Sequence, residues 1–186
     1  MTKQAHFTIL LGLSLAQLFT LTGCAVFTSD LRVRTPGSIF DDEIIESMVK
    51  REIRNSDPAF DSAHLVAVSY NGIVLLAGQV ESEALKSDAQ KAAERIGKVR
   101  AVHNELEVSG PISYVARTAD SWLTTKVKAK LLADKHTEAS KVKVVTENGV
   151  VYLMGLLPRD EADDAVEVAR RVYGVQKIVK VFEYLD

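Results

Sequence analysis

The sequence predicts an α+β fold in which one αββαβ unit occurs twice. Residues 42–108 and 120–184 follow the same pattern at an offset of 77 to 78 positions, and each copy has an Asn-Gly pair between two apolar segments. Segments with helical periodicity lie on both sides of that pair. Two copies of this length are too few for a solenoid. We therefore expect two small tandem domains, each a three-stranded mixed sheet with two helices on one face.

The first element of each copy is predicted to be a helix. Apolar residues recur there at a spacing near 3.6, and the residues that set the pattern are Ile45, Val49, Ile53, Leu123, Val127 and Leu131. Asp42 and Asp120 stand at the start of these two segments. Because a short carboxylate can accept the free amide hydrogens of a first helical turn, both are expected to be N-caps.

Two strands joined by a tight turn come next. Asn71-Gly72 and Asn148-Gly149 suit a type I′ turn, which requires positive φ at both central residues. The strands are expected over residues 64–69, 73–76, 141–146 and 150–154. Lysine and valine alternate from Lys141 to Val144, so this strand is expected to have one face in water.

A second helix and a last strand complete each copy. Gly97 and Gly174, which align at the offset of 77, are expected to end the helices in the left-handed conformation that glycine accepts. The helices are predicted over 83–96 and 159–173, and the strands over 99–108 and 176–184. Ser109-Gly110-Pro111 breaks the pattern. The expected domains are therefore residues 41–108 and 119–186, with a linker over 109–118.

The first residues have the pattern of a bacterial lipoprotein signal. Residues 7–21 are apolar and uncharged, but too short for a helix that spans a membrane. The segment from Leu21 to Cys24 resembles a lipobox, and Cys24 is the only cysteine of the chain. We expect residues 1–23 to be removed as a signal peptide and Cys24 to become the lipid attachment site. The alternative is an ordinary secretory signal with a chance cysteine nearby.

The segment after the cysteine is expected to be a tether. Residues 25–40 show no sustained periodicity and include Pro36-Gly37-Ser38, so residues 24–40 are expected to form the lipidated N-terminus and tether. Ala25 stands where lipoproteins kept in the inner membrane typically carry Asp, which favours anchoring in the outer membrane. A multiply acylated cysteine is a firm anchor, because each buried CH₂ contributes about 0.8 kcal/mol.

The sequence contains no pattern typical of an enzyme. Acylation of Cys24 would leave no thiol for a disulfide, a metal or a nucleophile. The histidines lack the spacing of metal ligands and are His6, His64, His103 and His136. There is neither a phosphate-binding loop nor a nucleophile elbow. We expect no catalytic residue, no metal and no cofactor, and a net charge of −2 does not require a nucleic acid partner.

The repeated αββαβ unit, the Asn-Gly hairpin that ends in a glycine and the helix closed by a glycine resemble the BON domain. The resemblance is closest in the second copy, at residues 122–127 (WLTTKV) and 146–156 (TENGVVYLMGL). Two such units behind a lipobox are similar to the dual-BON outer-membrane lipoproteins of the DolP type. The resemblance implies a non-enzymatic lipoprotein that faces the periplasm and binds anionic, phosphatidylglycerol-like phospholipid through its second BON domain. It also implies a role in outer-membrane integrity and cell division.

The charge of the two copies indicates where such a lipid would bind. Residues 41–110 hold 8 basic and 13 acidic side chains, a net charge of −5, whereas residues 111–186 hold 12 and 11, a net charge of +1. Trp122, the only tryptophan, suits a membrane interface because its ring is apolar and its N–H is polar. We expect Trp122 to insert and its basic neighbours to contact headgroups. These neighbours are Lys126, Lys128 and Lys130.

Helical spacing makes Lys126 and Lys130 the better pair for one flat surface. Two alternatives remain open at this point. Trp122 aligns with Ile44 and could belong to the core, and lysines on a small domain are usually a solvated face. A different function is also consistent with the sequence, in which the acidic first copy or a strand edge docks an envelope protein as an adaptor. A structural spacer that binds neither is the third possibility.

Overall fold

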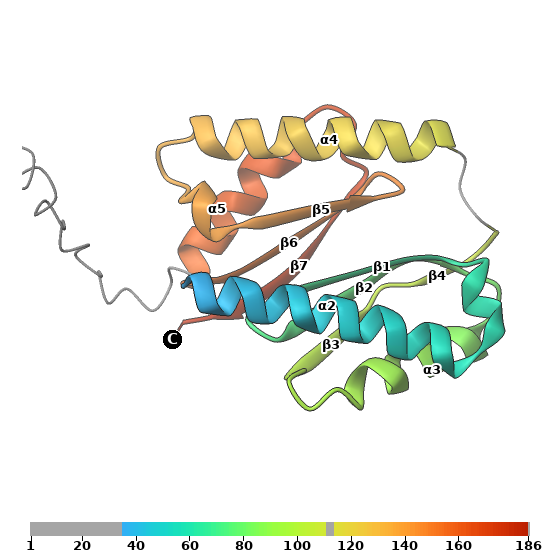
Figure 1. Cartoon of the computed structure of the whole chain (residues 1–186). Coiled ribbons are helices and arrows are strands. Elements are labelled where there is room, and N and C mark those ends of the chain that lie inside the picture. The colour runs from blue at the N-terminus through green and yellow to red at the C-terminus, as the bar shows by residue number, and fades with distance from the viewer. Residues whose placement is uncertain (1–34, 111–113, 186) are drawn as a thin grey trace, which may run out of the picture. The chain divides into compact units, whose positions relative to one another are not determined.

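The computed structural model describes residues 35–110 and 114–185, which lie in one compact unit that spans residues 31–186. Cys24 and the expected signal peptide lie outside these described residues. The described chain consists of two αββαβ domains, which confirms the predicted α+β class (Figure 1). None of its helices combines the length and the apolar character that crossing a bilayer requires.

The two domains contain corresponding elements. Domain 1 consists of α2 (Pro36–Ser56), the short 3₁₀ helix η2 (Pro58–Asp61), β1 (His64–Tyr70), β2 (Ile73–Val80), α3 (Glu83–Glu94), β3 (Ala101–Asn104) and β4 (Glu107–Val108). Domain 2 consists of α4 (Tyr114–Ala133), η3 (Ala139–Lys141), β5 (Lys143–Glu147), β6 (Val150–Leu157), α5 (Arg159–Arg170) and β7 (Lys177–Tyr184).

Each domain has a mixed sheet with its helices on one face (Figure 1). In domain 1, β2 pairs antiparallel with β1 and parallel with β3 and β4. In domain 2, β6 pairs antiparallel with β5 and parallel with β7. The expected single strand over 99–108 is divided into β3 and β4 at Glu105 and Leu106, where Leu106 N donates to the side chain of Asn104 at 3.3 Å.

Both first helices begin earlier than the sequence predicts. The helix α2 starts at Pro36, inside the expected tether, and Thr35 is its N-cap, with Oγ1 accepting from Ser38 N at 3.1 Å. The helix α4 starts at Tyr114, inside the expected linker. Asp42 and Asp120 are therefore within helices, so their prediction as N-caps was wrong.

Asp42 and Asp120 instead hold the Asn-Gly turns. Asp42 accepts hydrogen bonds from Asn71 N at 2.9 Å and Gly72 N at 3.0 Å. Asp120 accepts from Asn148 N and Gly149 N, both at 2.8 Å. The four turn residues have φ between 49° and 75°, which confirms the prediction of positive φ at both central positions.

The second helices end earlier than predicted, and this changes the alignment of the copies. They end at Glu94 and Arg170, and both contain 12 residues, so the offset between the copies is here 76. The strand pairing agrees, because β2 and β6 meet their parallel partners at Ala101 and Lys177. Gly97 therefore corresponds to Tyr173 rather than to Gly174. Only Gly174 of the two glycines has positive φ, at 105°.

The expectation of one face in water for the strand around Lys141 to Val144 was also wrong. The face of each sheet that points away from its helices packs against the other domain, in a cluster formed by Tyr70, Leu75, Ala77, Tyr152, Met154 and Val181. Lys141 is 4% exposed and pairs with Glu138 at 2.6 Å. Lys143 pairs with Glu46 of domain 1 at 2.9 Å. The two lysines that alternate with valine here are thus paired with carboxylates. A sequence pattern does not distinguish such paired lysines from lysines that face solvent.

Candidate functional site

The outer face of α4 exposes large apolar side chains. Leu123, Val127 and Leu131 face the core, as their spacing predicts, and are at most 5% exposed. On the other side of the helix, Trp122 is 67% exposed and Leu132 is 74% exposed. The structure therefore decides against a core position for Trp122. At about 100° per residue, the exposed residues of this side form one line along the helix. We call it the outer stripe, and it comprises Trp122, Thr125, Ala129 and Leu132.

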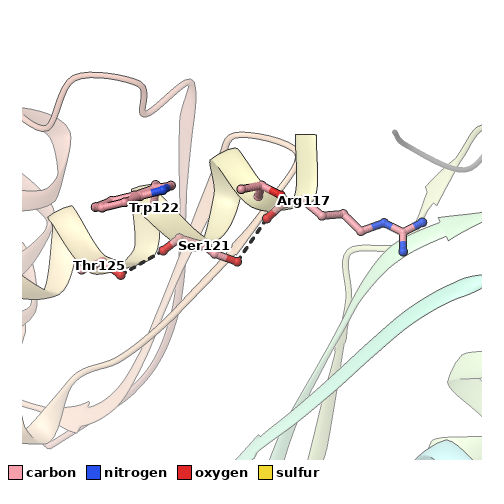
Figure 2. A pocket seen from close by; sticks show the side chains of 5 residues that line it. Arg117, Ser121, Trp122 and Thr125 are labelled. Atoms are coloured by element: carbon pink, nitrogen blue, oxygen red, sulfur yellow. Dashed lines mark hydrogen bonds between the residues drawn. The ribbon is translucent and has the colours of Figure 1, made fainter. Parts of the chain in front are cut away.

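Two hydroxyl groups beside Trp122 are already hydrogen-bonded within the protein. A shallow hollow beside the ring is lined by Arg117, Thr118, Ser121, Trp122 and Thr125 (Figure 2). Ser121 Oγ donates to the Arg117 carbonyl at 3.1 Å, and Thr125 Oγ1 donates to the Ser121 carbonyl at 3.0 Å. Both hydroxyls are thus bonded to the backbone of their own helix. The surface next to the indole can lose water without leaving these hydroxyls unpaired.

The three lysines predicted as headgroup contacts are all exposed, but they occupy different angles. Lys126 and Lys128 lie about 80° to either side of the centre of the outer stripe, whereas Lys130 lies about 120° from it. Because the exposed apolar residues now locate the centre of the stripe, Lys126 and Lys128 are the better pair to contact one surface. The sequence, without that reference, favoured Lys126 and Lys130. Neither Lys128 nor Lys130 forms an ion pair with the residues that the structure describes.

Lys126 differs from the other two lysines because its ammonium group is held in place. Lys126 Nζ donates to the Tyr173 carbonyl at 2.9 Å and lies 6.0 Å from the centre of the Tyr173 ring. This contact joins α4 to the turn between α5 and β7. It also fixes one positive charge next to Trp122, one helical turn along the same helix.

Two exposed apolar residues of this region were missed by the sequence analysis. Leu132 follows the core residue Leu131 and lies about 100° round the helix from it, on the side away from Val127 and Leu123, so it falls outside the core face that these residues define. That signal was available in the sequence. Tyr173 was assigned to the end of the expected helix over 159–173, whereas it lies in the turn and is 93% exposed. Its exposure depends on where α5 ends, which the sequence did not indicate.

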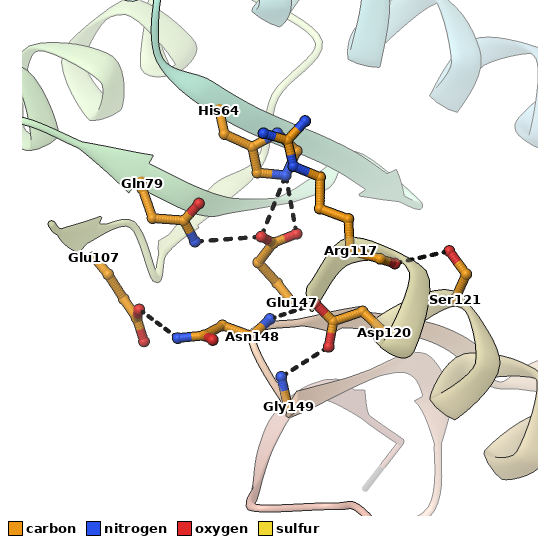
Figure 3. Close-up of polar contacts among 9 residues, drawn as sticks. All are labelled: His64, Gln79, Glu107, Arg117, Asp120, Ser121, Glu147, Asn148 and Gly149. Atoms are coloured by element: carbon orange, nitrogen blue, oxygen red, sulfur yellow. Dashed lines mark hydrogen bonds and ion pairs between the residues drawn. The ribbon is translucent and has the colours of Figure 1, made fainter. Parts of the chain in front are cut away.

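The helix α4 is also connected to domain 1 through the turn that Asp120 holds (Figure 3). Next to this turn, the Glu147 carboxylate lies 3.2 Å from His64 Nε2 and accepts from Gln79 Nε2, also at 3.2 Å. Asn148 Nδ2 donates to Glu107 of domain 1 at 3.3 Å. These contacts give His64 a structural environment at the domain interface. Within residues 35–110 and 114–185, no three side chains of metal-ligand type come together.

Domain 1 has a different surface at the corresponding place on α2. Ile44, which corresponds to Trp122, is half-buried, and Met48 corresponds to Lys126. Phe40 is 63% exposed. A shallow hollow on this helix is lined by Phe40, Glu43, Ile44, Ser47, Met48 and Arg51.

Comparison with known proteins gives two consistent findings. The family model of the BON domain matches residues 41–110 and 119–186. The chain is 42% identical to the outer membrane lipoprotein DolP of Haemophilus influenzae. The aligned 153 residues cover 82% of this chain and 79% of that protein. It is 39% identical to a 21 kDa hemolysin of Actinobacillus pleuropneumoniae, with the same coverage. It is 32% identical to the osmotically-inducible protein Y of Escherichia coli, over 80% of this chain and 75% of that protein.

Proposed function

Because the chain belongs to the BON-domain family, as an outer-membrane lipoprotein with two copies of the domain, we propose that its second domain binds anionic phospholipid. The observation that carries the proposal is the exposed Trp122 on a helix face flanked by lysines. The ligand is a bilayer surface with phosphatidylglycerol-like headgroups. The binding element is α4, which would lie flat on that surface.

The outer stripe supports this orientation. Trp122 and Leu132 are ten residues apart, which is about 15 Å along a helix, so both can contact one plane only when the helix lies parallel to it. Burying their exposed apolar surface would contribute about 25 cal/mol per Å². Thr125 and Ala129 between them are small and would not hold the helix away from the lipid.

The lysines supply the preference for negative charge. Each basic side chain near an anionic membrane contributes about 1 kcal/mol, and the contribution falls off within a Debye length. Lys126 and Lys128 on either side of the stripe would face headgroups while the stripe enters the interface. Lys130 would contribute less because it lies farther round the helix. Binding by α4 alone is weak, and the lipid on Cys24 would raise its effective concentration at the membrane.

The emission of Trp122 tests the proposal directly, because the chain has no other tryptophan. Residues 25–186, which include the whole compact unit from residue 31, are mixed with phosphatidylcholine vesicles that contain or lack phosphatidylglycerol. We expect a blue shift only with phosphatidylglycerol. The shift should decrease in high salt and in the variant Lys126→Glu/Lys128→Glu. Phe40→Glu, which changes an exposed aromatic residue of domain 1, is the matched control and should bind normally.

Emission that is unchanged by either vesicle would refute lipid binding by α4. A blue shift that is indifferent to salt and to both lysine changes would refute the part assigned to Lys126 and Lys128. Either result would turn attention to domain 1.

At the level of the cell, we propose that the protein supports outer-membrane integrity and cell division and has no catalytic activity. This proposal rests on the family resemblance and on the lipid binding proposed for the outer stripe of α4. A strain that lacks the protein should become more sensitive to detergent. The unaltered protein should restore resistance, and a Trp122→Glu variant that is still anchored should not. Full restoration by that variant would separate the cellular role from lipid binding.

A second function is favoured by the exposed Phe40 and the hollow around it, namely docking of an envelope protein on domain 1. A photo-crosslinking residue at position 40 should then yield a defined adduct in cells, and one at position 51 on the rim of the same hollow should yield the same adduct. If the Trp122→Glu variant lost the adduct, formation of the adduct would depend on membrane binding by domain 2, and docking on domain 1 alone would be refuted.

A further inference from the structure

Tyr173 is the most exposed of the large hydrophobic side chains in the described chain, at 93%. It lies between Val172, which packs into the core of domain 2, and Gly174, whose φ of 105° lets the chain turn into β7. The ring therefore contributes almost nothing to the core of the domain. An aromatic side chain in this position has no folding role that the structure shows.

The turn that carries Tyr173 lies beside α4 rather than behind it. Lys126 reaches from α4 to the Tyr173 carbonyl at 2.9 Å, and its ammonium group lies 6.0 Å from the ring centre. A Cβ atom added at Gly174 would lie 3.5 Å from Leu123 Cδ1 and 3.6 Å from Lys126 Nζ, so the turn and the helix are in contact. Trp122 lies one helical turn from Lys126 on α4, and Lys126 contacts Tyr173, so the three side chains make an aromatic–cation–aromatic strip across two elements.

Domain 1 provides the comparison for this position. The residue that corresponds to Tyr173 is Gly97, and a Cβ atom added there would meet nothing within 4 Å. The position thus points into open space in domain 1, as it does in domain 2. The strip is absent from domain 1, because Met48 and Gly97 stand where domain 2 has Lys126 and Tyr173.

We propose that Tyr173 is a third point of membrane contact, beside Trp122 and Leu132, which fixes how domain 2 is rotated about the axis of α4 on the lipid surface. This inference rests on the proposed lipid binding by α4. A helix that touches a bilayer along one stripe can roll about its axis. A third contact to the side of Trp122 and Leu132 defines a plane and so prevents the roll. A tyrosine suits this place because its ring is apolar and its hydroxyl can remain among the headgroups.

Lys126 gains a specific role in this arrangement. Its ammonium group is held at Tyr173 by the carbonyl and the ring of that residue. It would enter the headgroup region already positioned, with further N–H groups available for a phosphate. A lipid phosphate between Trp122 and Tyr173 would then meet a fixed charge rather than a flexible one.

Site-directed spin labelling tests the contact. Residues 25–186 contain no cysteine, so Tyr173→Cys and Gly97→Cys each accept one nitroxide label. On vesicles that contain phosphatidylglycerol, we expect the label at position 173 to become protected from a water-soluble nickel chelate. The label at position 97 should stay accessible. In addition, Tyr173→Ser should weaken vesicle binding about fivefold, while thermal unfolding stays unchanged because the ring lies outside the core.

The two proposals fail in different ways. If Trp122 shifts its emission but position 173 stays as accessible as position 97, α4 binds lipid and the inference about Tyr173 is wrong. The same conclusion follows if Tyr173→Ser binds as tightly as the unaltered chain. If Trp122 emission does not shift on these vesicles, the proposed lipid binding is wrong and the inference falls with it.

Discussion

Domain 1 and domain 2 are built on the same internal contacts but present different side chains to solvent. In both, an aspartate inside the first helix holds the Asn-Gly turn, and three apolar residues of that helix fill the core. The outward positions differ, because Ile44, Met48 and Gly97 correspond to Trp122, Lys126 and Tyr173. The comparison teaches that the fold tolerates these exchanges, so they can serve a surface that only one domain has.

The largest expected effect is on stability and concerns the aspartate that holds the Asn-Gly turn in each domain. Asp42→Ala should lower the free energy of unfolding by about 3 kcal/mol, because it would leave buried donors unpaired. Asp42 accepts from Ser69 Oγ at 2.6 Å as well as from two turn amides, whereas for Asp120 two turn amides are shown. Asp120→Ala should therefore cost less, about 2 kcal/mol. Urea denaturation measures both.

The control for these variants is Asp41→Ala. Asp41 is exposed and pairs with Lys98 on the surface at 2.8 Å, so its removal should cost below about 1 kcal/mol. Equal stability of all three variants would mean that the turns do not depend on the aspartates.

The next effect concerns the aromatic residue that only domain 2 exposes. Trp122→Ile should weaken binding to phosphatidylglycerol vesicles about tenfold, because isoleucine has less area to bury and no polar N–H. Adding Ile44→Trp to that variant should not restore binding. Although Lys50 corresponds to Lys128, Met48 stands in place of Lys126, and the acidic residues Glu43 and Glu46 lie next to position 44 in the sequence. Vesicle co-sedimentation measures both. Recovery of binding by the double variant would mean that any exposed tryptophan suffices.

A smaller effect is expected from exchanging the residues at the lysine position. Lys126→Met should weaken vesicle binding about fivefold at low salt, and the difference should shrink as salt is added. Met48→Lys in domain 1 should leave binding unchanged. Titrations at two ionic strengths separate these outcomes. If Lys126→Met weakened vesicle binding by the same factor at both ionic strengths, the contact of Lys126 with Tyr173 would matter more for binding than its charge.

The smallest effect concerns an ion pair between the two domains. Arg100 of domain 1 pairs with Glu183 of domain 2 through both terminal guanidinium nitrogens, whereas Gln176 stands at the position in domain 2 that corresponds to Arg100. The hydrogen bond from Arg100 lowers the pKa of Glu183. A carboxylate with a lowered pKa stabilises the fold above its unfolded pKa of about 4.3 and loses this contribution as the pH falls through its folded value.

Arg100→Gln should therefore reduce stability at pH 7, by less than about 1 kcal/mol because the pair is partly exposed. The difference from the unaltered chain should shrink as the pH falls below the unfolded pKa of about 4.3, because Glu183 then becomes protonated. Urea denaturation at pH 7 and at several acidic pH values checks the sign. A difference that does not shrink with falling pH would mean that Arg100 acts through packing.

The sequence predicted the architecture because its signals are local. Apolar spacing around Val49 and Val127 predicts the helices, and the Asn-Gly pairs predict the turns. The starts of α2 and α4 were missed because an aspartate before a helical segment indicates an N-cap unless its tertiary partner is known. Asp42 bonds to a turn about 30 positions later, and no local pattern reports such a contact.

Only the part of the candidate site that lies on one helix was predicted, because only that part has a local signal in the sequence. Trp122 and its lysines stand on one helix, and their composition is visible in the sequence. Whether Trp122 faces outward was open in the sequence, because it aligns with the apolar residue Ile44 and could have belonged to the core. Tyr173 joins the site only through the fold, which brings a turn 47 positions later against Lys126.

The packing of one sheet on the other has a consequence for dissection of the protein. Leu75, Tyr152 and Met154 are at most 3% exposed, and they lie in the cluster that both domains share. Either domain produced alone would expose its half of this cluster to water. A chain cut between the domains should therefore remain a two-fragment complex, whereas a single-domain fragment would expose an apolar patch that favours aggregation. Fragments made for binding experiments should contain both domains.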